Sequence, residues 1–237
     1  MVLRGRQLGE ADRILTLFTL ERGKLDAVAK GVRRPRSHLS GRVEFFNECD
    51  FLMHRGRSLD VIVSAEIFCA PWSRLVKPER YAVAAVIGEL IDAFCEPDLA
   101  MPEVYELLVG AIGAIAAATS PRVLIPRFSL RLLEMLGLAP PLTTCVRCGA
   151  PLQPGPVWLD AEAGGIVHGA CRERWQELPE LQQRDVENLR ALARPKGAQR
   201  GAAVLATLGA TAAVEELVAH HLGKHPKALA QLGSLGA

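Results

Sequence analysis

Four residues with metal-ligand chemistry stand in two short pairs in the second half of the chain. The first pair is Cys145 and Cys148, separated by two residues, and the second is His168 and Cys171 with the same separation. Two ligands at this spacing can turn toward one ion, and a second pair completes the tetrahedron that zinc prefers. Because four protein ligands leave no open coordination position, the pattern predicts a structural Zn²⁺ site rather than a catalytic one.

Glycine residues flank both ligand pairs. Gly149 follows the first pair, Gly164 and Gly165 precede the second, and Gly169 lies within it. Glycine permits the tight turns that such pairs need. The alternative is a chance spacing of three buried cysteines and a surface histidine, which we disfavour because two such pairs rarely coincide. We expect the metal to fix a loop that has little apolar content of its own.

No motif for catalysis accompanies this site. The sequence contains no Gly-rich phosphate loop and no nucleophile motif. His220, His221 and His225 are interpreted as a polar turn at the end of a helix, where the helix dipole favours histidine, rather than as a second metal site. We therefore predict that the protein is not an enzyme.

A second chemical feature is an excess of basic residues near the N-terminus. Residues 1–80 carry a net charge of +5, so the remainder carries −3 within a total of +2. The stretch 31–42 contains four arginines and no acidic residue. Guanidinium groups pair with phosphate oxygens and release counterions, which favours a nucleic-acid partner, with a solvated charged loop as the alternative. The candidate DNA ligands are Arg33, Arg34, Arg36 and Arg42, extended by Arg4, Arg6, Arg13, Lys24 and Lys30.

The first third of the chain is predicted to form strands. The expected strands are 2–8, 12–20, 24–30, 45–54 and 59–67, separated by short turns and one long loop. Closure into a small barrel would remove the exposed sheet edges, so an OB-like barrel is the main interpretation. An SH3-like barrel is the alternative that strand counting does not exclude. Aromatic residues are only 5% of the chain, so we expect DNA contacts led by phosphates.

The chain after the predicted strands shows helical periodicity. Pro78 and Pro102 begin predicted helices that run to about Phe94 and Ala118, and Ser120 caps a third that ends at Gly137. Further helices are expected at 180–192, 202–208 and 212–222. The predicted class is a multidomain α and β protein, with an OB-fold barrel followed by an all-helical domain that carries an inserted zinc-binding knuckle. The predicted ranges are 1–76 for the barrel, 77–140 and 176–237 for the helical domain, and 141–175 for the insert.

Composition indicates a soluble cytoplasmic protein. Hydrophobic residues make up 49% of the 237 residues, which suffices for a core. Cys49, Cys69 and Cys95 lie in apolar stretches and are predicted to be buried free thiols, which are typical of a reducing compartment. The first residues are too charged for a signal peptide, and no apolar run has the length of a membrane span.

Several segments carry a family resemblance. They are LGEADRILTLFT at 8–19, ERGKL at 21–25, AKGVRRPRS at 29–37, the stretch 127–137, and the knuckle with its glycines. On these segments the chain resembles the bacterial recombination mediators of the RecO family over nearly its whole length, least clearly after Pro179. The family usually has a cysteine where His168 stands, and histidine is an equally good zinc ligand.

The resemblance implies binding to single- and double-stranded DNA, annealing of complementary strands, and action with RecR and single-strand-binding protein to help load RecA. It implies no catalysis and a cytoplasmic, nucleoid-associated location. Arg127 and Arg131, four apart on an apolar helix, are candidates to accept an acidic peptide tail of single-strand-binding protein, with a solvent-reaching helix edge as the alternative. The alternative function is a zinc-stabilised scaffold that binds proteins without contacting DNA.

Overall fold

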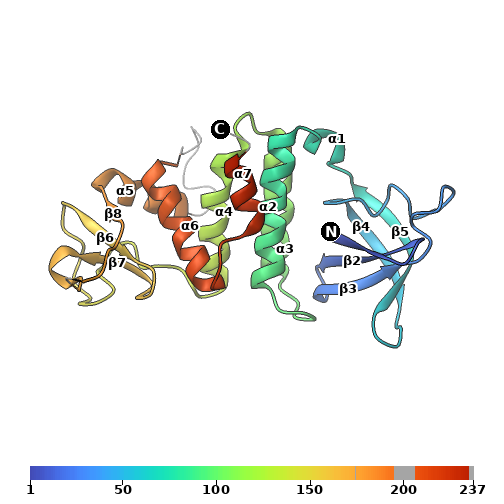
Figure 1. Ribbon diagram of the computed structural model, residues 1–237, viewed down its shortest axis with the longest axis horizontal. Helices are drawn as coiled ribbons and strands as arrows, with labels where there is room; N and C mark the ends of the chain where they lie inside the picture. The colour runs from blue at the N-terminus through green and yellow to red at the C-terminus, as the bar shows by residue number, and fades with distance from the viewer. Residues whose placement is uncertain (174, 195–205, 235–237) are drawn as a thin grey trace. The chain divides into compact units, whose positions relative to one another are not determined.

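The computed structural model describes residues 1–173, 175–194 and 206–234 (Figure 1). The chain forms two compact units. The first contains Met1–Arg122 and the helix that begins at Lys227, and the second contains Val123–Pro226. No helix in these described ranges is long and apolar enough to cross a membrane.

The first unit opens with a five-stranded sheet. Its strands are β1 (Val2–Leu8), β2 (Asp12–Thr19), β3 (Gly23–Ala29), β4 (Glu48–His54) and β5 (Asp60–Cys69). They are ordered β1-β2-β3-β5-β4, and neighbours are antiparallel except for the parallel pair β3 and β5. This order is that of an OB fold, so the predicted OB barrel is confirmed over the SH3-like alternative.

Alternation along the strands places one face of the sheet in the core. Leu15 and Leu17 on β2 and Leu25 and Ala27 on β3 are buried in one cluster, as period-two side chains must be when one face is covered. The long connection 30–47 also contributes to this cluster. Its apolar residues Val32, Leu39 and Val43 are each at most 5% exposed.

The ends of the sheet meet through the residues that precede β4. The N–H of Val2 donates to the carbonyl of Asn47 (3.2 Å), and the N–H of Phe46 donates to the carbonyl of Val2 (2.8 Å). The barrel is thus joined at one end by backbone hydrogen bonds. Cys49 is buried as predicted, whereas the prediction for Cys69 is wrong, because the last four residues of β5 lie outside the core and this thiol is exposed.

Four α-helices complete the described part of the first unit. They are α1 (Trp72–Leu75), α2 (Pro78–Phe94), α3 (Pro102–Ala117) and α7 (Lys227–Ser234). The two predicted prolines stand in the first turns of α2 and α3, where the missing N–H costs nothing. Helix α7 was not predicted. Its first two N–H groups donate to the Glu89 carboxylate of α2 at 2.9 and 2.7 Å, which satisfies donors that a helix start leaves open.

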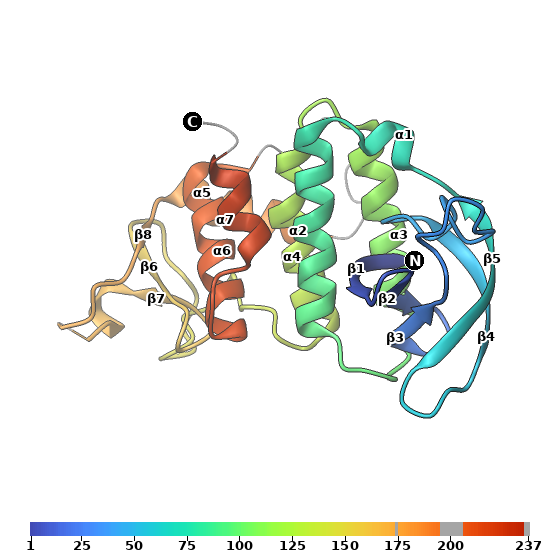
Figure 2. The ribbon, with the colours of Figure 1, turned by 45° about the vertical axis from the view of Figure 1, so that its right-hand side comes forward.

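Helices α2 and α3 contact the outer face of β1–β3 (Figure 2). Phe18 stacks on Tyr105 with ring centroids 6.3 Å apart. The Asp92 carboxylate of α2 accepts a hydrogen bond from Arg4 at 2.7 Å, and the ammonium of Lys24 donates to the Asp92 carbonyl. Much of the outer face of the first three strands is therefore occupied by the protein's own side chains.

In its described residues, the second unit contains three α-helices and a small sheet. A short turn, η1 (Pro121–Val123), leads into α4 (Leu124–Met135), and α5 (Gln183–Ala193) and α6 (Leu208–Leu222) pack with it. Between α4 and α5 lie β6 (Val157–Asp160), β7 (Gly165–His168), η2 (Gly169–Cys171) and β8 (Glu180–Leu181). The sheet order is β7-β6-β8.

The starts of these helices differ from the predicted ones. The prediction that Ser120 caps a helix is wrong, because Pro121 begins the turn η1 and the α-helix starts only at Leu124. Helix α6 begins at Leu208 with Thr207 as its N-cap. The predicted helix 202–208 lies mostly outside the described residues. The predicted domain ranges stay a prediction, and the structure groups α2, α3 and α7 with the barrel.

The turn between β2 and β3 generates a testable prediction. Gly23 has φ +66°, and a Cβ at this position would lie 1.8 Å from the Leu99 carbonyl oxygen. We expect Gly23→Ala to destabilise the protein by about 3 kcal/mol or more, since a backbone clash adds to the left-handed strain. Denaturant unfolding measures the loss.

Gly41→Ala is the matched control. Gly41 has φ +75°, and an added methyl group would meet nothing within 4 Å, so only the backbone strain of about 1 kcal/mol is expected. Equal losses for the two variants would contradict the close packing at Gly23.

Candidate metal centre and nucleic-acid surface

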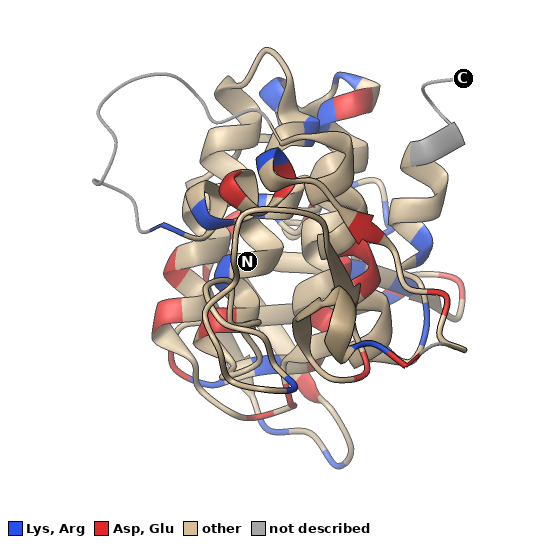
Figure 3. Ribbon diagram, turned by 90° about the vertical axis from the view of Figure 1, so that its left-hand side faces the viewer, with Lys and Arg blue, Asp and Glu red and all other residues tan. Residues whose placement is uncertain are grey.

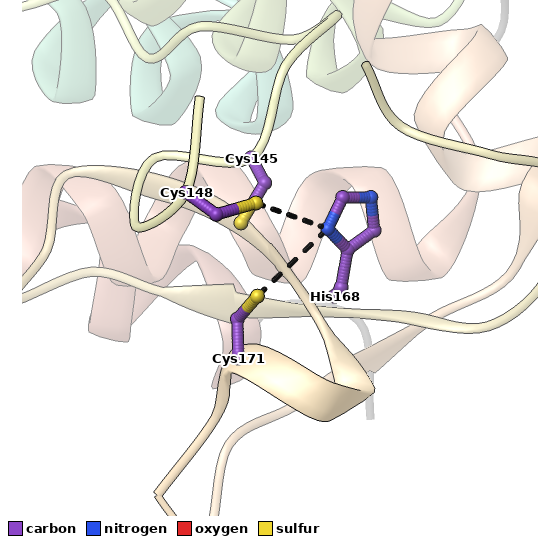
Figure 4. A group of neighbouring side chains, drawn as sticks. All are labelled: Cys145, Cys148, His168 and Cys171. Atoms are coloured by element: carbon purple, nitrogen blue, oxygen red, sulfur yellow. Dashed lines mark hydrogen bonds between the residues drawn. The ribbon is translucent and has the colours of Figure 1, made fainter. Parts of the chain in front are cut away.

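The four predicted metal ligands come together in the second unit (Figure 4). Their ligand atoms all lie within 4.8 Å of one another. Nδ1 of His168 is 3.6 Å from Sγ of Cys148 and 4.0 Å from Sγ of Cys171. Tetrahedral zinc, with Zn–S near 2.3 Å, separates its ligand atoms by roughly 3.5–3.8 Å. The geometry therefore fits a tetrahedral ion.

The orientation of His168 favours metal binding. Its Nε2 lies 3.2 Å from the carbonyl oxygen of Pro151. Because a carbonyl only accepts hydrogen bonds, Nε2 carries the proton, and the lone pair of Nδ1 is directed at the cysteines. A backbone acceptor on the second nitrogen is the usual partner of a metal-binding histidine.

Backbone donors favour the ionised form of Cys145. Burial alone would raise the pKa of this thiol, but backbone hydrogen bonds from Cys148, His168 and Arg147 lower its pKa to about 6. The pKa of Cys171 is raised to about 11, first by a side-chain hydrogen bond with Cys148 and also by the neighbouring Cys145. Adjacent thiolates repel, and a divalent cation between them would remove this repulsion and ionise both.

The first ligand pair lies on a turn closed by backbone hydrogen bonds. The N–H of Gly149 donates to the carbonyl of Cys145, and the N–H of Cys145 donates to the carbonyl of Ala150, both at 2.9 Å. Gly149 has φ +74°, a value that other residues rarely adopt. The N–H of Val146 donates to the carbonyl of Ile166 on β7 at 3.0 Å, which fixes this turn beside the second pair.

The other flanking glycines serve two purposes. Gly164 turns the chain with φ +80°. Gly165 and Gly169 are required by crowding, because a Cβ would lie 2.5 Å from Val146 at the first position and 2.7 Å from the Trp158 ring at the second. The glycines noted in the sequence thus allow both sharp turns and close contact.

The insert has a core of its own. The prediction of a loop with little apolar content is wrong, because short strands bury branched aliphatic residues at their centre. The residues at most 3% exposed are Val157, Leu159, Ile166, Val167 and Leu181. The strands have only two to four residues each, so their periodicity gave no clear signal in the sequence.

Arg147 connects the two ligand pairs. It stands between the first two cysteines, and its guanidinium donates to Asp160 from Nε at 3.1 Å and from Nη2 at 2.7 Å. Nη1 donates to the carbonyl of Cys171 at 3.2 Å and to Glu173 at 3.3 Å, and Nη2 also donates to Gln176 at 2.7 Å. The Asp160 side chain is 1% exposed, so it depends on this partner.

The basic stretch predicted to bind DNA lies within the connection between β3 and β4. Four cations at the start of this connection are exposed, and within the described ranges no carboxylate lies at ion-pair distance from any of them. These residues are Lys30, Arg33, Arg34 and Arg36. Their charge is available to a ligand.

The start of this connection is fixed against the β1–β2 turn. The N–H of Gly31 donates to Oδ1 of Asp12 at 2.7 Å, and the N–H of Arg33 donates to the carbonyl of Ala11 at 3.0 Å. The Arg33 guanidinium also donates to the carbonyl of Glu10 at 3.0 Å. The basic residues therefore lie beside the β1–β2 connection, which OB folds use for oligonucleotide binding.

The remaining DNA candidates make other contacts. Arg42 is exposed and, like Arg33, donates only to a backbone carbonyl, that of Ala65 at 2.8 Å, which holds the connection to β5. Four candidates on the strands pair with carboxylates: Arg4 with Asp92 (2.7 Å), Arg6 with Asp26 (3.8 Å), Arg13 with Glu44 (3.8 Å) and Lys24 with Asp92 (3.7 Å). Within the described ranges, four of the nine candidates thus pair with carboxylates and five do not.

Arg55 and Arg57 were not predicted as site residues. Both lie on the exposed connection between β4 and β5, the second connection that OB folds use for oligonucleotides. The Arg-Gly-Arg pattern was visible, but its role depended on knowing which strands it joins.

Arg127 and Arg131, the candidates for binding an acidic peptide, lie on α4, and both are half-buried. Arg127 donates to the carbonyl of Arg194 at 3.1 Å, and Arg131 pairs with Glu134 at 2.8 Å.

The three histidines at the end of α6 form no metal group in the part of the chain that the structure describes. His220 and His221 stand in the last turn of that helix, as expected.

Together these features define an OB-fold protein with a helical C-terminal region and a Cys/His cluster that can hold a metal ion. Residues 1–70 match the family model "Recombination protein O N terminal", and residues 76–230 match "Recombination protein O C terminal". The chain therefore belongs to the RecO family, which confirms the resemblance noted in the sequence.

Curated relatives agree with this assignment. A protein of Bifidobacterium adolescentis is 41% identical over 177 residues, which cover 72% of this chain and 71% of the relative. One of Bifidobacterium longum is 39% identical over 170 residues and 70% of each chain. One of Desulforamulus reducens is 34% identical over 194 residues, 82% of this chain and 75% of the relative. Each bears the name DNA repair protein RecO.

The cluster predicts one zinc ion per chain. We expect Cys148→Ser and His168→Ala to lose bound zinc and lower the thermal stability of the chain, whereas His168→Cys retains zinc because thiolate and imidazole are both good ligands. Elemental analysis and thermal unfolding measure these effects. Cys69→Ser, at an exposed thiol of the first unit, is the control, and zinc loss there would contradict the assignment.

Removal of the Arg147 side chain should weaken zinc binding, because its contacts hold both ligand pairs in place. Arg147→Ala should lower zinc affinity roughly tenfold, the usual effect of losing an outer contact of a metal site. Competition with a chromogenic chelator measures it. Arg184→Ala, at an exposed arginine of α5, is the control, and equal affinities would show that Arg147 does not position the ligands.

Proposed function

We propose that this protein is a recombinational DNA repair mediator that binds single- and double-stranded DNA and anneals complementary strands. Membership of the RecO family and the names of its curated relatives support a role in DNA repair. The observation that carries the DNA contact is the group of exposed cations at 30–36, which have no carboxylate partner among the described residues.

The chemistry of this contact is electrostatic. Guanidinium groups form paired hydrogen bonds with phosphate oxygens, and each contact releases condensed counterions. The available cations lie on a connection whose apolar residues are buried in the barrel core. Such an anchored loop presents its charges without having to be ordered on binding, which lowers the entropic cost of association.

The role requires no catalytic step by this chain. Annealing needs two strands held near one another with their charge neutralised, and the bases then pair by themselves. The Zn²⁺ held by Cys145, Cys148, His168 and Cys171 would be structural, since all four positions are filled by protein. It would fix the insert and take no part in a reaction.

We further propose that the protein acts with RecR and single-strand-binding protein to help load RecA, in the cytoplasm at the nucleoid. An acidic peptide tail is the expected ligand of Arg127 and Arg131. In the structure Arg131 is paired with Glu134 across one helical turn. A peptide carboxylate would exchange with Glu134 in this intrahelical pair, which contributes little stability.

Annealing of complementary oligonucleotides, with and without single-strand-binding protein, tests the proposed function. We expect acceleration by the wild-type protein in both conditions. Absence of DNA binding at low salt would favour the scaffold alternative, in which the protein binds only other proteins.

The basic connection yields a quantitative prediction. Replacing Arg33, Arg34 and Arg36 by Ala should lower affinity for single strands and reduce the slope of log affinity against log salt by about 2, since each phosphate contact contributes roughly 0.7. Fluorescence anisotropy across a salt series measures the slope. The control is Arg74→Ala with Arg184→Ala, two exposed arginines away from this connection. An unchanged slope in the triple variant would contradict the assignment.

A further inference from the structure

The outer face of β2 is buried, as its core face is. The outward residues Ile14, Thr16 and Phe18, together with Val28 beside them on β3, are each at most 9% exposed. OB folds that bind oligonucleotides use this face of their second and third strands together with the adjoining loops. In this protein most of that face lies inside the molecule and is closed to the bases of a strand.

Side chains of the first unit close this face. The Phe18 ring stacks on Tyr105 of α3 with ring centroids 6.3 Å apart, and the Tyr105 hydroxyl donates to the Glu48 carboxylate at 3.0 Å. The Thr16 hydroxyl donates to the Asp26 carboxylate at 2.6 Å. The aromatic ring of β2 is therefore used within the protein rather than for stacking on a base.

The opening that remains on this face is polar. It is a cleft of about 510 Å³, and charged residues of both signs make up most of its lining, among them Arg22, Lys24, Asp26, Asp60 and Asp92. Among the described residues, no aromatic side chain lines it. Sequence-tolerant binding of single strands usually stacks bases on aromatic rings, and this cleft does not offer such a surface.

The exposed cations follow the end of β3. Over the helices and loops visible in Figure 3, basic and acidic residues are interspersed, whereas residues 30–36 carry four cations and no acidic residue. Hydrogen bonds from the N–H groups of Gly31 and Arg33 fix their backbone to Asp12 and Ala11. A strand bound here meets groups that suit its phosphates.

Phosphates are common to DNA and RNA. Contacts to phosphates position a protein on a nucleic acid without reading its bases, and a protein tells RNA from DNA through the 2′-hydroxyl of the sugar. The pairing of a guanidinium group with a phosphate involves neither the base nor this hydroxyl. A contact of this kind therefore suits either type of strand.

We propose that single-stranded RNA is a second substrate of this protein, bound by the cations of residues 30–36 with an affinity close to that for DNA. The proposal rests on the proposed function and widens its substrate class. Because annealing needs only two strands held together with their charge neutralised, the protein also pairs an RNA strand with complementary DNA to give a hybrid duplex.

Three single strands with equal numbers of phosphates test the proposal on the whole, zinc-loaded chain. They are oligodeoxyuridine, oligouridine and an abasic deoxyribose strand, each of about 16 nucleotides. The first two differ only in the 2′-hydroxyl, and the third lacks every base. We expect the three affinities to agree within about threefold, with parallel salt slopes, because phosphates carry the contact. Fluorescence anisotropy across a salt series measures both quantities.

A variant tests whether the two types of strand share one site. Replacing Arg33, Arg34 and Arg36 by Ala should reduce the salt slope by about 2 for uridine and deoxyuridine strands alike, since each phosphate contact contributes roughly 0.7. The control is Arg74→Ala with Arg184→Ala, and thermal unfolding verifies that each variant is folded. A loss confined to one type of strand would overturn the shared site.

Hybrid annealing supplies a functional readout. A labelled DNA strand should anneal to complementary RNA at a rate within about threefold of that for complementary DNA, since the same phosphates are neutralised. The triple variant should slow both reactions, and gel analysis of the RNA verifies that it stays intact.

The outcomes separate this inference from the proposed function. A preference of about tenfold or more for deoxyuridine over uridine strands, or a loss of that size when the bases are removed, refutes the inference and leaves the proposed function standing. Hybrid annealing slower than DNA annealing by about tenfold or more refutes it as well. If no strand binds at low salt, both proposals are refuted. Equal binding of the three strands together with hybrid annealing supports RNA as a substrate.

Discussion

The parallel pairing of β3 with β5 is the constraint on which the first unit depends. It consists of two residue pairs, Ala27 with Asp60 and Val28 with Val61. Parallel strands cannot be joined by a tight hairpin, so the chain must cross the barrel through a long connection and β4 before it returns as β5. That crossing supplies residues 30–47, and the return supplies the β4–β5 connection. The two groups of available cations are thus consequences of one strand order.

Basic residues on the strands differ from those at the start of the long connection in their neighbours. Arg4 and Lys24 pair with Asp92 of α2, whereas Arg6 and Arg13 pair with carboxylates on β3 and on the connection itself. A neighbouring carboxylate, more than residue type, decides which arginine is available to a phosphate.

The insert between α4 and α5 replaces a large core with two complementary restraints. The small sheet buries a handful of aliphatic side chains, which is too few to fix long turns. The four metal ligands hold the two turns from one side, and the Arg147 contacts with Asp160 and the Cys171 carbonyl hold them from the other. The ligand set and this arginine are interleaved in sequence, so one short segment carries both restraints.

Much of this organisation was predictable from sequence because it rests on local signals. Strand β1 and helix α2 have the predicted bounds, since the turn residues that follow Leu8 and the first-turn proline of α2 are local signals. The metal ligands were predictable because their spacing is itself the signal. The short strands β6 to β8, the helix α7 and the partners of Arg4 or Lys24 were not, because they depend on residues distant in sequence. The exposure of Cys69 likewise follows from where β5 leaves the core, and hydropathy does not report that position.

Helix α7 has a consequence for how the protein is made. The chain completes α3, builds the whole second unit, and only then returns to place Lys227 against the Glu89 carboxylate of α2. During synthesis the barrel and its first helices leave the ribosome long before this helix exists. The surface of α2 that α7 covers stays open throughout that interval, so the first unit becomes complete only after the second has been synthesised.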